Sequence, residues 1–161
     1  MALAIDWLGI AEGSASDARG AVTLVGVGQT VVIAPSLPHK EARAVMVVVL
    51  DDDGSVLVDP DSPVALTLEI RSPSDKLLLA TTQTFSTRQA INPAAIPEGV
   101  PTRGFQLVMS LNLEFTEYGP HTIKVSISVA DNDSVERIRR LYVVPPAPAG
   151  QALAAAASFS A

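Results

Sequence analysis

Apolar and polar residues alternate with a period of two along much of this chain. The run from Phe105 to Phe115 is the clearest case, and 122–129 repeats the pattern after a short turn. Because a half-buried strand places every second side chain in the core, this alternation predicts strands. The segment 44–50 is apolar without interruption, which predicts a central strand covered on both faces, with a short helix as the alternative. The expected strands cover residues 2–12, 21–27, 29–34, 44–50, 66–70, 76–85, 105–115, 122–129 and 135–144.

Eight or nine short strands without an amphipathic helix predict an all-β fold. Since each sheet needs another layer to cover its apolar face, we expect an antiparallel two-sheet β-sandwich, immunoglobulin-like or related, with a closed β-barrel as the alternative. The domain is expected to span 1–145, and the Pro- and Ala-rich residues 146–161 to form a flexible tail. Residues 87–103 contain three prolines and are expected to form a long loop, which is uncommon unless the loop is functional or mobile.

The composition fits one soluble domain with a sizeable core, since the chain has 161 residues, of which 48% are hydrophobic and 17% charged. The formal net charge of −6 disfavours nucleic acid and anionic membranes as partners, because both repel an acidic protein. There is no cysteine, and neither a secretory signal nor a membrane-spanning run is recognisable, which predicts a cytoplasmic protein without disulfides. Low charge and high apolar content favour self-association, and we expect a homodimer.

The chain resembles an uncharacterised bacterial β-sandwich family, a domain of unknown function, over residues 3–145. Residues 20–28 are similar to the family's N-terminal strand with its Gly-x-Gly, and 33–35 to the apolar-Pro step that follows it. Residues 96–101 are similar to its Pro-rich loop, 111–113 to its Leu-Asn strand, and 119–125 to its strand that begins with Gly. His121 stands where the family places a Tyr. The resemblance implies a sandwich fold and carries no activity over to individual residues.

Five carboxylates lie close together in the sequence, at Asp51, Asp52, Asp53, Asp59 and Asp61. Hard oxygen ligands in a loop suit calcium, so one hypothesis is a calcium-binding sandwich that uses this loop. The EF-hand spacing is absent, and Asp-Gly is also the residue pair that a tight hairpin turn favours, so the alternative interpretation is a plain turn. We expect no cofactor.

The two histidines, His39 and His121, raise the hypothesis of a small hydrolase in which one of them activates Ser110 or Ser126. No Gly-x-Ser-x-Gly motif is present, and we do not expect an enzyme. His121 is interpreted instead as a corner residue hydrogen-bonded to the backbone, and His39 as an exposed loop residue.

Contact with a protein partner is predicted for a basic cluster and for the tail. Arg137, Arg139 and Arg140 suit a carboxylate or phosphate of a partner, or else form the charged face of an edge strand. Leu153 and Phe159 are apolar residues of the tail that suit a groove on a neighbouring subunit.

Trp7 is the single tryptophan of the chain. On strand periodicity it shares a face with Ile5 and is expected in the core, with an interface anchor as the alternative. Together these patterns predict a non-enzymatic protein-binding or assembly module, which presents its long loop or an exposed strand edge to another protein.

Overall fold

The computed structural model describes residues 3–18, 22–28, 30–51, 61–86, 103–130 and 134–148. Every helix or strand assigned within these ranges is a β-strand, and none of them forms a helix that is long and apolar enough to cross a membrane. The strands are β1 (Leu3–Ala11), β2 (Gly13–Ser16), β3 (Val22–Val25), β4 (Val31–Ile33), β5 (His39–Asp51), β6 (Pro63–Arg71), β7 (Leu77–Ser86), β8 (Arg103–Phe115), β9 (Gly119–Val129) and β10 (Val135–Val144).

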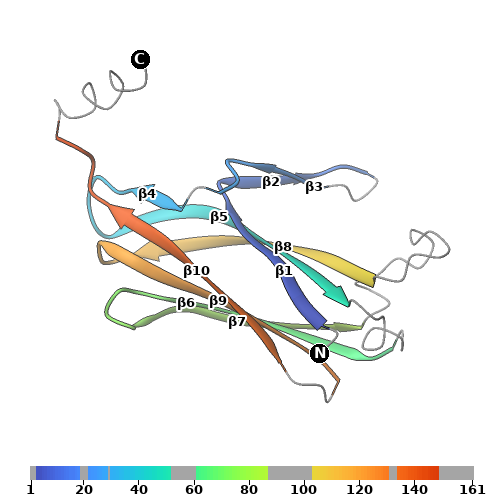
Figure 1. Ribbon diagram of the computed structural model, residues 1–161. Helices are drawn as coiled ribbons and strands as arrows, with labels where there is room; N and C mark the ends of the chain where they lie inside the picture. The colour runs from blue at the N-terminus through green and yellow to red at the C-terminus, as the bar shows by residue number, and fades with distance from the viewer. Residues whose placement is uncertain are drawn as a thin grey trace, which may run out of the picture.

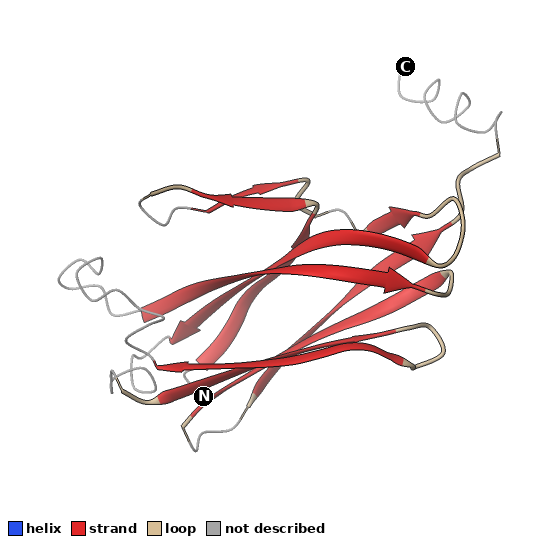
Figure 2. Cartoon of the chain, turned by 180° about the vertical axis from the view of Figure 1, so that it is seen from behind, coloured by secondary structure: helices blue, strands red, loops and turns tan. Residues whose placement is uncertain are grey.

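The strands form three sheets (Figure 1). One has the order β1-β5-β8, a second the order β4-β10-β9-β6-β7, and β2 and β3 form a two-stranded hairpin that contacts β5 and β8 (Figure 2). All pairings are antiparallel except that of β4 with β10, which is parallel. The predicted all-β sandwich is therefore confirmed, and the described strands do not close into the alternative barrel.

The core lies between the three-stranded and the five-stranded sheet. On β6 and β9 every second residue is fully buried, as the alternation predicted, because these strands occupy the middle of the larger sheet. The continuously apolar segment 44–50 is part of β5, the central strand of the smaller sheet, so the helix alternative is wrong. Its inward residues Val45, Val47 and Val49 are completely buried, which removes their apolar surface from water and stabilises the fold.

Two strand boundaries differ from those expected. Gly13–Ser16 was expected to separate strands, but it pairs with Val22–Val25 as β2. His39 was expected in an exposed loop, but it is the first residue of β5 and is half-buried. The polar residues at the start of β5 hid this extension, since Lys40 is accommodated by an ion pair with Glu114 on the neighbouring strand at 3.3 Å.

Trp7 lies on the outer face of the smaller sheet, so the prediction of a core position is wrong. The register passes from Ile5 opposite Val49 to Trp7 opposite Val48, which leaves Asp6 as the extra residue of a β-bulge. A bulge shifts the alternation by one residue, and every side chain after it changes face. The Trp7 ring then lies over Gly9, where an added Cβ would be 1.8 Å from the indole carbon Cη2.

Candidate functional site

Arg137 and Arg139 connect the two sheets along one flank of the sandwich. They lie in register with Val125 and Ile123, whose side chains are buried, so both arginines emerge from the inner face of β10. Arg137 Nη1 donates to the carbonyl oxygens of Ile5 and Asp6, and Arg139 Nε donates to that of Leu8 at 3.2 Å. Because β1 is an edge strand, these guanidinium groups occupy carbonyls that another strand would otherwise use.

Arg140 points in the opposite direction, onto the outer face of the larger sheet. It is exposed and stands opposite Thr122, with Ile138 and Tyr142 two residues before and after it on the same face. The predicted basic cluster is thus divided, since two of its arginines contact β1 and the third remains at the surface with apolar neighbours.

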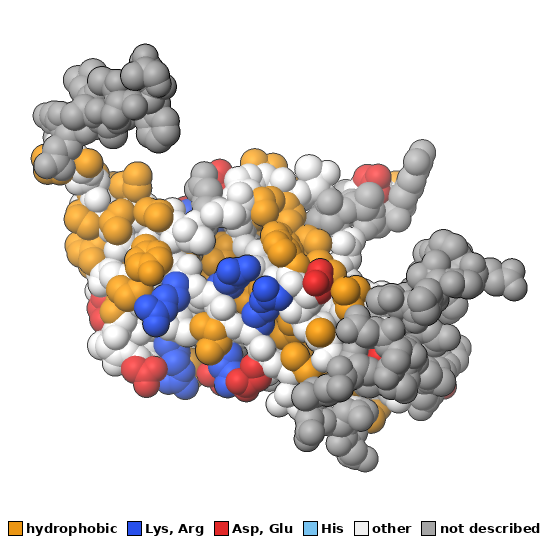
Figure 3. Space-filling view, viewed as in Figure 1, with side chains coloured by type: hydrophobic (Ala, Val, Ile, Leu, Met, Phe, Trp, Pro, Cys, Tyr) orange, Lys and Arg blue, Asp and Glu red, His pale blue; other side chains and the backbone are white. Residues whose placement is uncertain are grey.

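Four large apolar side chains lie on the same outer face of β4 and β10 as this arginine, and we call them, together with Arg140, the β4–β10 patch. Their exposed fractions are 46% for Val31, 62% for Ile33, 56% for Ile138 and 41% for Tyr142. The parallel register sets Tyr142 beside Val31, so the two strands contribute to one surface. Figure 3 shows hydrophobic side chains gathered over β4 and the end of β10, next to basic side chains.

The β4 strand exposes Val31 and Ile33 because the residue between them points into the core. Val32 is buried, and the alternation therefore turns Val31 and Ile33 outward. The strand is held at both ends: Tyr142 N donates to Thr30 O at 2.7 Å, and Ala34 N donates to Val144 O at 2.9 Å. The apolar surface is consequently carried by backbone that is fixed to β10.

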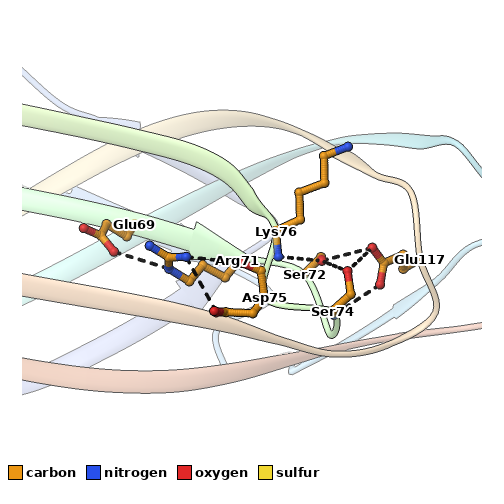
Figure 4. Close-up of polar contacts among 7 residues, drawn as sticks. All are labelled: Glu69, Arg71, Ser72, Ser74, Asp75, Lys76 and Glu117. Atoms are coloured by element: carbon orange, nitrogen blue, oxygen red, sulfur yellow. Dashed lines mark hydrogen bonds and ion pairs between the residues drawn. The ribbon is translucent and has the colours of Figure 1, made fainter.

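A polar cluster joins two turns at one end of the sandwich (Figure 4). The Glu117 carboxylate accepts hydrogen bonds from Ser72 Oγ at 3.0 Å, Ser74 Oγ at 2.6 Å and Ser74 N at 3.2 Å. These bonds favour the charged form, and the Ser74 hydroxyl contributes most to holding the pKa of Glu117 below its ordinary value of 4.5. The cluster ties the β6–β7 turn to the β8–β9 turn.

His121 is fully buried, and its environment is structural. Its Nδ1 is 3.2 Å from the Gly119 carbonyl oxygen, and its ring meets Phe115 edge-on with centroids 5.0 Å apart. Burial is the main cause that lowers the pKa of His121, because it penalises the charged imidazolium. The interpretation of His121 as a corner residue bonded to the backbone is confirmed.

His39 lies near a carboxylate. Its Nε2 is 3.7 Å from Glu41 Oε2. Within the described ranges neither His39 nor His121 is hydrogen-bonded to a serine or threonine hydroxyl, so the nucleophile and base that the hydrolase hypothesis requires are not found together there.

Arg43 is a buried charge that the sequence analysis missed. Its side chain is 3% exposed, with Nη2 2.5 Å from Glu41 Oε1 and Nη1 4.0 Å from Glu12 Oε1. Alternation along β5 places Arg43 and Glu41 on the same side as the core residue Val45. The signal for this pair was the charge pattern just before the apolar run 44–50, which is unusual for a strand that enters a core.

The acidic residues proposed as calcium ligands are only partly described. Asp51 is completely buried at the end of β5 and Asp61 is exposed, while Asp52, Asp53 and Asp59 lie outside the described residues. In the part of the chain that the structure describes, no three His, Asp or Glu side chains form a group that could hold a metal ion. Leu153, Phe159 and the loop over 87–102 also lie outside the described residues.

Two hollows open on the described surface, with volumes of about 420 and 220 Å³. The larger follows the ends of β5 and β8, and the smaller lies beside the Trp7 ring and Arg139. Neither hollow is lined by a histidine, so neither places His39 or His121 in a cavity, as the hydrolase hypothesis requires.

Comparison with known proteins finds similarity of shape to solved structures. No protein-family model matches the chain, and no curated protein matches it. Among solved structures the chain is similar to the C-terminal domain of wzt, with 16% sequence identity and a TM-score of 0.42 over 91% of this chain and 75% of that one. The resemblance to a bacterial sandwich family therefore stays a prediction, and function is inferred below from this chain's own residues.

Proposed function

We propose that this chain is a non-enzymatic protein-binding module and that the β4–β10 patch is its binding surface. The observation that carries the proposal is the exposure of four large apolar side chains, between 41% and 62% each, on two adjacent strands. Exposed apolar residues are ordinary when scattered, but contiguous ones mark interaction sites on soluble proteins. Tyrosine and arginine, both present in the patch, are the residue types most often found at the energetic centres of interfaces.

The partner in this proposal is an extended segment of another protein that carries a carboxylate between apolar side chains. Arg140 lies between Ile138 and Tyr142 on the outer face, so a carboxylate bound to it would be flanked by apolar contacts. A guanidinium group receives a carboxylate through two parallel hydrogen bonds, which fixes orientation as well as charge. The chain as a whole carries a net charge of −6, so a positive group in an apolar setting is a local feature that selects an acidic ligand.

An extended ligand is favoured because the patch side chains follow the alternation of two adjacent strands. Alternate side chains of such a ligand contact one face and supply specificity. Val31 and Ile33 are separated by one residue on β4, and such a spacing matches the side chains that an extended segment presents to one face. A cytoplasmic location remains part of this proposal, as do the absence of nucleic-acid partners and of catalysis.

The experiment is a selection of random peptides on the full chain, followed by titration of the selected peptides against variants. We expect the selected sequences to combine a carboxylate with apolar residues, and Tyr142→Ser and Arg140→Glu each to raise their Kd about tenfold or more. The matched control is Val25→Ser, which removes an apolar side chain of similar exposure, 59%, on β3, outside the patch. Peptides that bind Tyr142→Ser and Arg140→Glu as tightly as the parent chain would refute the proposal, as would a selection that yields no binder.

A further inference from the structure

The four sheet edges of the sandwich differ in how they are protected. The edges are β1 and β8 in the smaller sheet and β4 and β7 in the larger one. The β1 edge is contacted by Arg137 and Arg139, and β4 is only three residues long. Arginine contacts and short edge strands are both devices that prevent an edge from pairing with another chain.

The β7 strand has neither of these two devices, and its register with β6 is regular from Leu79 to Ser86, after a shift at Leu78. Its sequence, LLLATTQTFS, is ten residues long and contains no charged residue and no proline. The nearest charges belong to the turn before it (Figure 4). Arg71 in this turn lies 3.6 Å from Asp75 and 3.6 Å from Glu69, and the exposed Lys76 directly precedes Leu77, the first residue of β7. A long, uncharged edge strand is a template for pairing with a further strand.

The side chains on the inner face of β7 are not fully covered by the rest of the described structure. Thr81 and Gln83 stand opposite Leu68 and Leu66, which are fully buried, so they belong to the inner face of the sheet. Gln83 is nevertheless exposed and Thr81 only half-buried. The larger sheet therefore extends past the cover that the described strands of the smaller sheet provide.

The strand is held firmly from within the molecule. Phe85 of β7 meets Phe105 of β8 edge-on, with ring centroids 5.9 Å apart, which connects the two sheets at this flank. The Thr67 and Thr82 hydroxyls are 3.0 Å apart and hydrogen-bonded, on the side of β7 that faces β6. An ordered strand loses little further entropy when it pairs, which favours association.

We propose that two copies of this chain associate through β7, with the two β7 strands antiparallel across a two-fold axis so that the five-stranded sheets become one continuous sheet. In this arrangement a single sequence supplies both sides of the interface, as an isologous interface requires. Antiparallel pairing over the regular part of β7, from Leu79 to Ser86, supplies roughly one hydrogen bond per residue. The threonine-rich centre of β7 places threonine side chains beside one another, a favourable cross-strand combination.

The charge distribution favours pairing of β7 with the β7 strand of a second copy over pairing with another part of that copy's surface. Two copies with a net charge of −6 each repel one another, and this repulsion is least where the surfaces brought together are neutral. The β7 strand is such a surface, and antiparallel pairing sets its charged turn end opposite the uncharged Ser86 end of the partner strand. This proposal uses a surface and an occupant different from those of the β4–β10 patch.

The experiment measures the mass of the full chain in solution by light scattering, from micromolar to near-millimolar concentration. We expect a species of twice 16.8 kDa. Thr84→Lys places a lysine on the exposed outer face of β7. We expect this variant to raise the dimer dissociation constant about tenfold or more, because the two-fold axis brings like charges into the same interface. The matched control is Thr23→Lys, which makes the same charge change at an exposed position of β3 and is expected to remain dimeric.

Each other result overturns the inference. A parent chain that is monomeric throughout the range contradicts it, and so does a Thr84→Lys variant that dimerises like the parent. A mass above that of a dimer contradicts the closed two-fold arrangement. Loss of the dimer in Tyr142→Ser with retention in Thr84→Lys would assign self-association to the β4–β10 patch instead. Unchanged melting temperatures of the variants, measured alongside, separate lost pairing from lost folding.

Discussion

Arg137 of β10 donates a hydrogen bond to the backbone carbonyl oxygen of Ile5 in β1, on the opposite sheet. The same guanidinium donates to the carbonyl of Asp6, the extra residue of the β1 bulge. The arginine satisfies both carbonyls with a charged donor at the position of the bulge. Within the described residues, one flank of the sandwich is thereby closed by side chains.

Replacing Arg137 with alanine is expected to destabilise the fold by about 2 kcal/mol, because a charged donor is removed and two carbonyls lose their partner. Urea unfolding followed by circular dichroism gives this free energy. Arg140→Ala, at the surface of the same strand, is expected to change stability by less than about 0.5 kcal/mol. Equal effects of the two substitutions would mean that the contacts of Arg137 with β1 do not hold the sheets together.

Gly9→Ala is expected to displace the Trp7 ring, since the new Cβ would lie 1.8 Å from the indole. Because Trp7 is the single tryptophan, its fluorescence reports the change directly, and we expect a shift of emission to longer wavelength with about 1–3 kcal/mol of destabilisation. Gly13→Ala is the control, since a Cβ at Gly13 meets nothing within 4 Å. Identical spectra for Gly9→Ala and the parent would place the ring elsewhere.

Stability is expected to fall as the solution is acidified through the titration of Glu117. The pKa of this carboxyl is lowered in the folded state, chiefly by the Ser74 hydroxyl, so the folded protein binds its proton less tightly than the unfolded chain. The resulting stabilisation is present above the ordinary pKa of 4.5 and is lost as the pH falls through the lower folded value. Unfolding midpoints measured in this acidic range should depend less on pH in Glu117→Gln, and an unchanged slope would contradict the role of the cluster.

His121 is expected to contribute a second loss of stability on acidification, and this loss begins at a higher pH than the one caused by Glu117. Burial lowers its pKa in the folded state, so below the ordinary value of 6.5 the unfolded chain takes up a proton that the folded protein does not. The stabilisation is complete above 6.5 and declines as the pH falls toward the folded pKa. Titration of the imidazole by NMR measures this value, and a pKa at or above 6.5 would contradict the buried, neutral ring.

The strands in the middle of each sheet could be predicted from the sequence because their burial repeats with a regular period. On β6 and β9 the alternation alone identifies the buried residues, and the seven apolar residues 44–50 that follow Arg43 identify a central strand. Cover on both faces was overestimated, since the outward residues Met46, Val48 and Leu50 are only half-buried. Turn chemistry located the hairpin between β6 and β7 for the same local reason.

The features that shape the candidate surfaces depend on contacts between distant parts of the chain. Nothing in the residues around Asp6 marks a bulge, so Trp7 was assigned to the wrong face. The parallel pairing of β4 with β10 joins residues more than a hundred positions apart, and it alone creates the β4–β10 patch. The charge pattern at the start of β5 contains the Arg43–Glu41 pair, but the approach of Glu12 to Arg43 at 4.0 Å joins distant parts of the chain and has no signal within β5.

The most direct test of the central claim, protein binding at the β4–β10 patch, is a charge-exchange titration. A selected peptide with one carboxylate and its counterpart with lysine at that position are each titrated against the parent chain and Arg140→Glu. The proposal predicts that the carboxylate peptide binds the parent at least about tenfold more tightly than Arg140→Glu, and that the lysine peptide shows the reverse preference. If both peptides bind the two proteins equally, Arg140 does not contact the ligand and the patch is not the binding surface.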